Sequence, residues 1–311
     1  MCGIVGYIGK LEATPILIDG LRRLEYRGYD SAGVATLNGE GISVRKCKGR
    51  IANLAEVVDR NPLGGNQGIS HTRWATHGGV TDENAHPHFD FSGKLALVHN
   101  GVIENYQAIK EELQAEGHTF RSETDTEVLA HLIGKHYECL GGEPGRKRLV
   151  EALRRALKEV KGTYGIALMH EDLPGVLVGA RRGSPLVLGV GKGENFLASD
   201  VSAIVSHTRE AVYLHDYDIV VLDQDGFEIT TVSGSPSGYE VSTVDFSEEE
   251  VGKGDYPHYM LKEIFEQPDS ICDAMRGRLA REEATGRLGG LNMTPKELRE
   301  IDRIVLTGCG T

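Results

Sequence analysis

The first six residues, Met1-Cys2-Gly3-Ile4-Val5-Gly6, constrain this chain more than any other stretch. Removal of the initiator methionine would leave Cys2 with a thiol and a free α-amine on one residue. A thiolate is a strong nucleophile, and an amine with a pKa of about 7.7–8.0 can take its proton near neutral pH. The stretch therefore predicts a nucleophile that carries its own base, followed by a buried strand from Ile4. The alternative, a start codon followed by an inert buried cysteine, stays open from these residues alone.

The length and composition exclude several classes of protein. A chain of 311 residues can form one large domain or two ordinary ones, and 26% charged residues is typical of globular proteins. The net charge of −12 argues against nucleic acid or an anionic membrane as the main partner. No apolar run is long enough to span a bilayer and no signal peptide is evident, so we expect a cytoplasmic protein. Five scattered cysteines without a CxxC pair predict reduced thiols.

The hydrophobic pattern predicts short strands on either side of a block of helices. The expected strands are 4–8, 32–37, 42–47, 69–71, 95–99, 164–169, 176–179, 186–190, 196–198, 212–214, 219–222 and 227–232. The expected helices are 12–25, 51–60, 106–116, 126–137 and 148–160. The start of the helix at 126–137 is indicated by a capping-box pattern, formed by Thr124 and Glu127. This arrangement predicts a layered α+β domain.

A second, incomplete domain is expected after a linker. We predict that residues 2–238 form the first domain, 239–254 the linker, and 255–311 the start of the second. Helices are expected at 259–266 and 271–283. A strand at 301–306 would run into the glycine turn 307–311, which is of the kind that cradles phosphate. Such a unit needs a following helix and neighbouring strands, so we expect the chain to stop at the start of an α/β domain and this segment to be poorly stabilised.

Four stretches beyond the N-terminus carry residue types that catalysis uses. They are Glu25–Gly33, His71–Gly78, His99–Gly101 and Ser122–Glu127. Each also has an ordinary structural explanation. Glu25–Gly33 could be a helix C-cap with a surface Arg, and His71–Gly78 a buried Trp with a snorkelling Arg. His99–Gly101 could be a type I′ turn, and Ser122–Glu127 a helix N-cap.

The four stretches are chemically complementary. Arg73 and Asp125 could hold the carboxylate and ammonium groups of an amino acid. The side-chain amide of Asn100 and the N–H of Gly101 could hold an oxyanion. With Cys2 attacking a side-chain carbonyl, the substrate described is a zwitterion with an acyl group at its far end, and glutamine fits. The histidines His71, His77, His86, His88 and His99 match no standard zinc spacing, so no metal is expected.

The N-terminal stretch and the Arg27-Gly28 loop resemble the class II glutamine amidotransferases, which are N-terminal nucleophile hydrolases. Longer strings are similar to one family among them, the isomerising glutamine–fructose-6-phosphate aminotransferases. These strings are Leu21–Gly33, His71–Gly78, Ser122–Glu127, His258–Pro268 and Gly308–Thr311. The resemblance covers essentially the whole chain. It implies a four-layer α/β/β/α domain followed by the truncated start of an α/β sugar-isomerase domain.

The resemblance also implies a mechanism and a set of roles. Glutamine would be hydrolysed through a γ-glutamyl thioester on Cys2, with Asn100 and Gly101 as the oxyanion hole and Arg73 and Asp125 as the anchors of the substrate. The other implied residues are Arg27 and Gly28 around the nucleophile, Trp74, Thr76 and His77 on a closing loop, His86 as a candidate lining residue, and Thr311 at an incomplete sugar-phosphate site.

The implied partners are L-glutamine and, where the isomerase half is present, fructose 6-phosphate. The full-length enzyme is expected to be a homodimer, and no cofactor is implied. This chain alone is expected to hydrolyse glutamine without making glucosamine 6-phosphate. Three alternatives remain. They are an amidotransferase of the kind that opens purine synthesis, an amino-acid-binding module with a structural Cys2, and a cysteine hydrolase with His71 or His77 as its base.

Overall fold

The computed structural model describes residues 2–75, 77–244, 254–275, 279–280, 285–286 and 294–305. The chain divides into two compact units, residues 1–248 and 249–311. The predicted domain boundaries stay predictions, although the segment expected as a linker contains a short strand, β14 (Ser242–Thr243), that pairs with the first unit's sheet.

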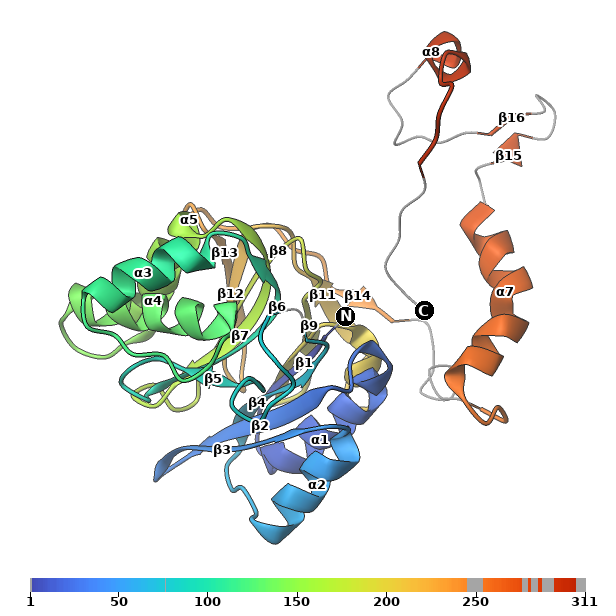
Figure 1. Cartoon of the computed structure of the whole chain (residues 1–311). Coiled ribbons are helices and arrows are strands. Elements are labelled where there is room, and N and C mark those ends of the chain that lie inside the picture. The colour runs from blue at the N-terminus through green and yellow to red at the C-terminus, as the bar shows by residue number, and fades with distance from the viewer. Residues whose placement is uncertain are drawn as a thin grey trace. The chain divides into compact units, whose positions relative to one another are not determined.

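Two antiparallel sheets form the first unit (Figure 1). In spatial order the eight-stranded sheet contains β14, β11 (Glu210–Tyr213), β9 (Val187–Val190), β10 (Asn195–Ala198), β1 (Gly3–Ile8), β4 (Gln67–Arg73), β2 (Ser31–Asn38) and β3 (Gly41–Lys48). The six-stranded sheet contains β13 (Phe227–Thr231), β12 (Asp218–Leu222), β8 (Leu177–Arg182), β7 (Gly162–His170), β6 (Leu95–Ile103) and β5 (His88–Phe89). All the strand pairs in both sheets are antiparallel.

Helices cover the outer face of each sheet. The eight-stranded sheet packs against α1 (Ala13–Leu24) and α2 (Ile51–Arg60), and the six-stranded sheet against α3 (Tyr106–Ala115), α4 (Asp125–Leu140) and α5 (Arg146–Glu159). Two short 3₁₀ turns, η1 (Glu25–Arg27) and η2 (Val201–Ala203), complete the unit. The unit therefore has four layers in the order α/β/β/α, which confirms the predicted fold (Figure 1).

The alternation of apolar side chains explains the layering. In β6, Leu95 and Leu97 belong to the core beneath the helices, while Ala96 and Val98 belong to the core between the sheets. Successive side chains of a strand point to opposite faces, so a strand that is buried on both faces reads as a continuous apolar run. Full burial of each such leucine contributes about 1.5–3 kcal/mol relative to exposure.

The strand predicted at 95–99 was too short. In the structure β6 continues through Asn100 and Gly101 to Ile103, because β7 pairs with it along that whole length. The type I′ turn that Asn-Gly suggests is therefore excluded. Strand β5 was missed, since two residues inside a polar loop give no periodic signal.

The predicted cap of α4 is half right. The Thr124 hydroxyl accepts a hydrogen bond from the N–H of Glu127, as expected of an N-cap. The Glu127 carboxylate instead accepts from the N–H groups of Arg121 and Ser122, at 2.9 and 2.6 Å. The acidic side chain therefore orders the turn that leads into the helix.

The second unit differs more from prediction. One helix, α7 (Tyr259–Met275), runs through Pro268 where two were expected. Leu279–Ala280 (β15), inside the predicted second helix, pairs as a strand with Thr285–Gly286 (β16), just beyond its predicted end. A short helix, α8 (Pro295–Arg299), was missed although Thr294 and Glu297 form a capping box before it. Residues 301–305, expected as a strand, have no regular structure. The glycine turn that follows lies outside the described residues.

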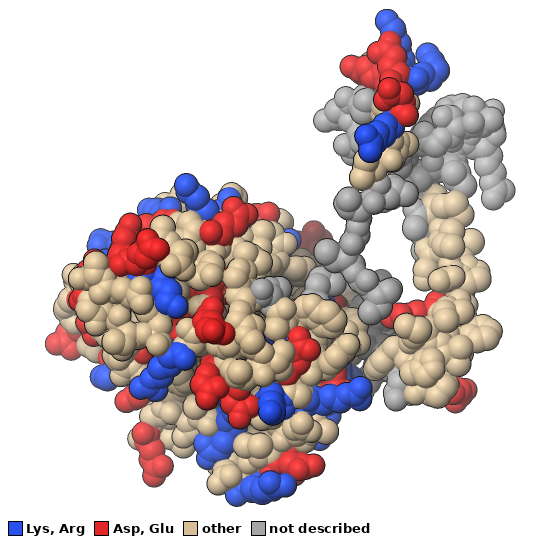
Figure 2. Space-filling model, in the orientation of Figure 1, with Lys and Arg blue, Asp and Glu red and all other residues tan. Residues whose placement is uncertain are grey.

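The surface of the first unit carries charges of both signs. Figure 2 shows acidic and basic side chains interspersed over the visible face, in keeping with the modest excess of acidic residues in the sequence. Within the described part of the chain, no helix combines the length and the apolar character that crossing a membrane requires.

Candidate active site

Cys2 lies at the junction of three neighbouring strands. Gly3 is opposite Thr72 in the β1–β4 pair, and Ser31 is opposite Arg73 in the β2–β4 pair. This register brings the start of β1 beside the end of β4. The N–H of Trp74 donates to the Sγ of Cys2 at 3.2 Å, and the thiol can donate to the Trp74 carbonyl at 3.5 Å.

The surroundings of Cys2 determine its protonation. Burial raises the pKa of its thiol above the ordinary value, and the hydrogen bond from Trp74 and the positive charge of Arg73 oppose that shift only in part. The thiol is therefore protonated at neutral pH. A reaction that starts from this sulfur needs a base to take the proton.

The second sheet supplies a hydrogen-bond donor to the backbone of Cys2. The Nδ2 of Asn100 donates to the Cys2 carbonyl at 3.1 Å, and the Oδ1 of the same amide lies 3.0 Å from the Nε2 of His71. The next residue, Gly101, has a φ of +133°, and a Cβ there would lie 2.1 Å from the Thr163 carbonyl oxygen. Only glycine fits that position of β6.

The loop before β2 is held against the nucleophile by close backbone contacts. A Cβ on Gly28 would lie 2.8 Å from the carbonyl carbon of Arg73 and 2.9 Å from the nitrogen of Trp74. The hydroxyl of Thr72 donates to the Gly28 carbonyl. The buried guanidinium of Arg27 forms an ion pair with Asp200 at 2.8 Å. The contact with Gly28 positions the Arg73–Trp74 peptide, whose N–H donates a hydrogen bond to the sulfur of Cys2.

The two predicted anchors, Arg73 and Asp125, are both buried. The Arg73 guanidinium donates to the carbonyls of His77 and Gly79, the second at 3.1 Å. Burial lowers the pKa of Arg73, while the neighbouring acidic groups Cys2, Asp30 and Asp125 raise it. The Asp125 carboxylate accepts from the N–H of Ile103 at 2.9 Å. Arg73 on β4 therefore interacts electrostatically both with Cys2 and with Asp125, the first residue of α4.

The loop after β4 is anchored from the first sheet. Trp74 is 44% exposed and meets the ring of Tyr29 edge-on, with centroids 5.6 Å apart. The N–H of Ala75 donates to the Asp30 carboxylate at 2.9 Å. The structural alternative for this stretch, a buried Trp with a snorkelling Arg, is wrong, because Trp74 is exposed and Arg73 is the buried member. Thr76 lies outside the described residues, as does Thr311.

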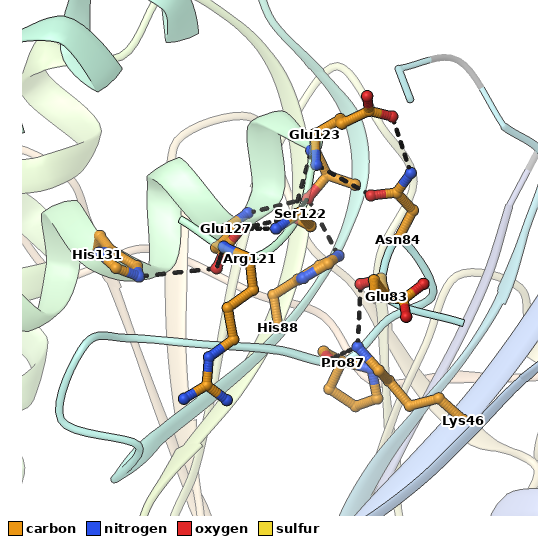
Figure 3. Close-up of polar contacts among 11 residues, drawn as sticks. Lys46, Glu83, Asn84, Pro87, His88, Arg121, Ser122, Glu123, Glu127 and His131 are labelled. Atoms are coloured by element: carbon orange, nitrogen blue, oxygen red, sulfur yellow. Dashed lines mark hydrogen bonds and ion pairs between the residues drawn. The ribbon is translucent and has the colours of Figure 1, made fainter. Parts of the chain in front are cut away.

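The far end of the same loop is fastened to the start of α4. The Glu123 carboxylate accepts from the N–H of Gly79 and from the Nδ2 of Asn84, both at 3.2 Å. In return the N–H of Glu123 donates to the Oδ1 of Asn84 at 2.9 Å. Figure 3 shows these two side chains facing each other. Because the Gly79 carbonyl also accepts from Arg73, this pair, the Asn84–Glu123 clasp, fixes the position of a predicted anchor.

His86, the candidate lining residue, packs against His71. Its ring is buried, stacks on His71 with centroids 4.0 Å apart, and accepts the N–H of His99 on Nδ1 at 3.3 Å. Burial lowers its pKa well below the ordinary value, so the ring is neutral. His77, by contrast, lies on the loop with its ring against Tyr106, at a centroid distance of 5.2 Å.

A model of the glutamine amidotransferase domain family matches residues 71–206, which include the end of β4, the loop that follows it, β6 and α4. The chain is 54% identical over 311 residues to the isomerising glutamine–fructose-6-phosphate aminotransferase of Thermus thermophilus. The comparison covers 100% of this chain and 49% of that enzyme. This chain contains a glutamine amidotransferase domain. The chain spans about half the length of the relatives that it matches.

Other relatives agree with this assignment. The isomerising aminotransferase of Methanosarcina acetivorans is 47% identical to this chain, over 100% of this chain and 50% of its own. The solved structure of glutamine phosphoribosylpyrophosphate amidotransferase from B. subtilis superposes with a TM-score of 0.63 at 28% identity. It covers 76% of this chain and 50% of that one. The chain is thus homologous to the N-terminal half of the isomerising aminotransferases.

The structure adds residues to the candidate site to which the sequence alone assigned no role. Asp30 and His71 lie inside stretches that were singled out, so their residue types were a usable signal. Asp200 and Asn84 had no signal, because their partners Arg27 and Glu123 are 173 and 39 residues away in sequence. Among the described residues, no three His, Cys, Asp or Glu side chains gather as metal ligands would.

Proposed function

We propose that this amidotransferase hydrolyses L-glutamine to L-glutamate and ammonia, with Cys2 as its nucleophile. The observation that carries the proposal is the hydrogen bond from the Asn100 amide to the Cys2 carbonyl, 3.1 Å long. It brings a two-hydrogen donor to the nucleophilic residue, and only one of those hydrogens is used by the carbonyl. The second is available to an oxyanion that forms beside the sulfur.

The reaction begins once removal of Met1 leaves the α-amine of Cys2 free. This amine takes the thiol proton, and the sulfur attacks the γ-carbonyl of glutamine. The oxygen becomes an oxyanion held by the Asn100 amide and the Gly101 N–H. Collapse breaks the C–N bond, and the ammonium of Cys2 returns the proton so that ammonia leaves. Water, deprotonated by the same amine, then hydrolyses the thioester and releases glutamate.

The substrate is held by its two charged ends. Arg73 takes the α-carboxylate and Asp125 takes the α-ammonium, and both lie in a buried environment where charge-assisted hydrogen bonds are strong. The loop with Trp74, Thr76 and His77 covers the bound molecule. Arg27 and Gly28 hold the peptide that follows Arg73 in place. These roles leave a glutamine side chain pointing at Cys2.

The ammonia acceptor is proposed from the relatives. Their names give fructose 6-phosphate as the acceptor and isomerisation as part of the reaction. We propose that this chain supplies ammonia for the same reaction, which yields glucosamine 6-phosphate, and that the transfer requires the half of the enzyme that the relatives have in addition. A contact between Thr311 and the sugar phosphate, and a homodimeric assembly, are proposed only for an enzyme that includes that additional half.

Phosphoribosylpyrophosphate is a second candidate acceptor, because a solved structure with that substrate in its name has the same fold. Identity weighs against it. The phosphoribosylpyrophosphate enzyme is 28% identical over 76% of this chain, whereas the fructose-6-phosphate enzyme is 54% identical over all of it, including residues 249–311.

The test is intact mass before and after reaction with 6-diazo-5-oxo-norleucine, with peptide mapping of the adduct, alongside a glutaminase assay. We expect a chain that lacks Met1, a single adduct on Cys2, and release of glutamate that Cys2→Ala abolishes. An adduct elsewhere would contradict the N-terminal mechanism. Binding of glutamine without turnover by a processed chain would favour the amino-acid-binding module. Full activity of a chain that retains Met1 would favour a histidine base.

A further inference from the structure

We infer that His71 is a positioning residue for the oxyanion hole, holding the Asn100 amide with its nitrogen toward Cys2. The inference rests on the proposed function, since it concerns how that hydrolysis is supported. The Cys2 carbonyl can only accept, so the atom of Asn100 that lies 3.1 Å from it must be the nitrogen. Oδ1 then faces His71, whose Nε2 lies 3.0 Å away.

This geometry determines the tautomer of His71. Oδ1 carries no hydrogen, so Nε2 must carry the proton and donate it. Burial lowers the pKa of His71 to about 3, so the ring is neutral throughout the physiological range. Among the described residues Nδ1 has no hydrogen-bond partner. The side-chain hydrogen bond of the ring is therefore the one to Asn100, and the backbone of His99 is its other polar neighbour.

The ring of His71 is held rigidly. Its backbone lies in the middle of the sheet, opposite Ile4 of β1 and Gly33 of β2. Its face stacks on His86 at a centroid distance of 4.0 Å and an interplanar angle of 19°. A Cβ on Gly33 would lie 2.1 Å from the His86 carbonyl oxygen, so glycine there is what allows the stack to close. The Nε2–H of a ring held in this way can donate only toward Asn100.

An asparagine needs such a donor because its terminal torsion is broad and roughly twofold. The two orientations of the Asn100 amide differ in whether the nitrogen or the oxygen points at the forming oxyanion. Oxyanion stabilisation depends on donors that are aimed before the charge develops. The flipped orientation would point two hydrogen atoms at the His71 proton and an oxygen at the Cys2 carbonyl. His71 therefore selects the productive orientation.

The position of His71 also separates this role from that of a base. Its proton faces Asn100, on the second sheet, whereas the Sγ of Cys2 exchanges hydrogen bonds with the backbone of Trp74. A base for Cys2 would have to face the sulfur with an unprotonated nitrogen. His71 acts through Asn100, so its loss should affect the formation of the oxyanion and not the reactivity of the thiol.

Three variants of the processed chain test the inference. His71→Gln places an amide nitrogen near the former Nε2 and keeps the donor. His71→Asn is polar but too short, and His71→Leu fills the space without a donor. For His71→Leu and His71→Asn we expect a fall in glutaminase kcat of about tenfold to a hundredfold, below the loss for deleting an oxyanion donor. KM should change less than about threefold, because the substrate anchors remain.

The remaining readouts distinguish positioning from structure. His71→Gln should recover kcat to within about fivefold of wild type, and alkylation of Cys2 by iodoacetamide, which needs no oxyanion hole, should stay within about twofold in all three variants. Should His71→Leu not fold, the contrast between His71→Asn and His71→Gln decides. Equal kcat in those two amides overturns the inference, and so does slowed alkylation. Wild type and Cys2→Ala are assayed in parallel, and a wild type without glutaminase activity would refute the proposed function itself.

Discussion

The side-chain amide of Asn100 and the backbone carbonyl of Cys2 are joined by a hydrogen bond of 3.1 Å that runs between the two sheets. Asn100 belongs to β6 of the six-stranded sheet, and Cys2 directly precedes β1 of the eight-stranded sheet. The candidate oxyanion donor and the candidate nucleophile are thus positioned by different layers. Their alignment depends on the packing between the sheets as well as on the side chains themselves.

Asn100→Asp should remove the donor and place a carboxylate where the oxyanion forms. We expect glutaminase kcat to fall by about 10²- to 10³-fold, with little change in KM because Arg73 and Asp125 are untouched. Steady-state kinetics with glutamine measures both values. Asn53→Asp on the exposed face of α2 is the matched control and should stay within about twofold of wild type. A kcat for Asn100→Asp near that of wild type would remove Asn100 from the mechanism.

Glu123→Ala should weaken substrate binding through the Asn84–Glu123 clasp (Figure 3). Glu123 accepts the N–H of Gly79, whose carbonyl accepts from Arg73. Without the carboxylate the loop loses one fastening, and Arg73 loses a fixed position. We expect KM for glutamine to rise about threefold to tenfold, the equivalent of one net hydrogen bond, with kcat nearly unchanged.

The matched control for Glu123→Ala is Glu112→Ala, since Glu112 is exposed on α3 away from the clasp. Its KM should equal that of wild type. If Glu123→Ala lowered kcat and left KM alone, the clasp would instead act on the chemical step, and the position of Arg73 would not depend on it.

The layers could be predicted from periodicity because burial dictates it. Helix α2 has the predicted bounds, and Ile51, Leu54 and Val58, its buried residues, repeat at helical spacing. The Asn100-Gly101 pair shows where such local reasoning fails. Asn-Gly is a strong turn signal, yet β7 continues to pair as far as Ile103, and the ladder of hydrogen bonds outweighs the turn preference.

The site could be predicted in part, for a similar reason. Roles for Cys2, Arg73 and Asp125 could be proposed from residue type, since a terminal thiol can act as a nucleophile and a charged side chain can bind a charged group of a ligand. His71 has many uses, and the one that it has here depends on which group faces it. Asn84 contacts Glu123 only because two loops meet at the start of α4. Such pairings come from the three-dimensional arrangement and have no counterpart in a single sequence.

Stability should fall in mild acid because histidines are buried in their neutral form. Burial lowers the pKa of His71 to about 3, and it also lowers those of His86, His88 and His99. In the unfolded chain each titrates near 6.5. Between these values the unfolded state binds more protons, so the free energy of unfolding decreases as the pH falls below about 6.5. Each histidine contributes a slope approaching about 1.4 kcal/mol per pH unit.

Urea unfolding at several pH values, followed by circular dichroism, measures this slope. His71→Gln removes one of the titrating groups, so its slope below about pH 6.5 should be shallower than that of wild type by up to about 1.4 kcal/mol per pH unit. Identical slopes would mean that His71 is not buried neutral in the folded protein. Above that pH both chains should show flat stability from this source, because the histidines are neutral in both states.

Gly28→Ala should damage both stability and activity, because no space exists for the added methyl group. A Cβ there would lie 2.8 Å from the carbonyl carbon of Arg73 and 2.9 Å from the nitrogen of Trp74, and both are backbone atoms. Overpacking of this kind costs about 1–3 kcal/mol. The peptide that must move is the one whose N–H donates to the Sγ of Cys2. We therefore expect a lower midpoint of urea unfolding and at least about a tenfold loss of kcat/KM, since catalysis depends on sub-ångström positioning.

Gly39→Ala is the matched control, because nothing lies within 4 Å of its added methyl group, and it should match wild type in both measurements. Equal behaviour of the two variants would mean that the contact between Gly28 and the Arg73–Trp74 peptide is not what positions the nucleophile.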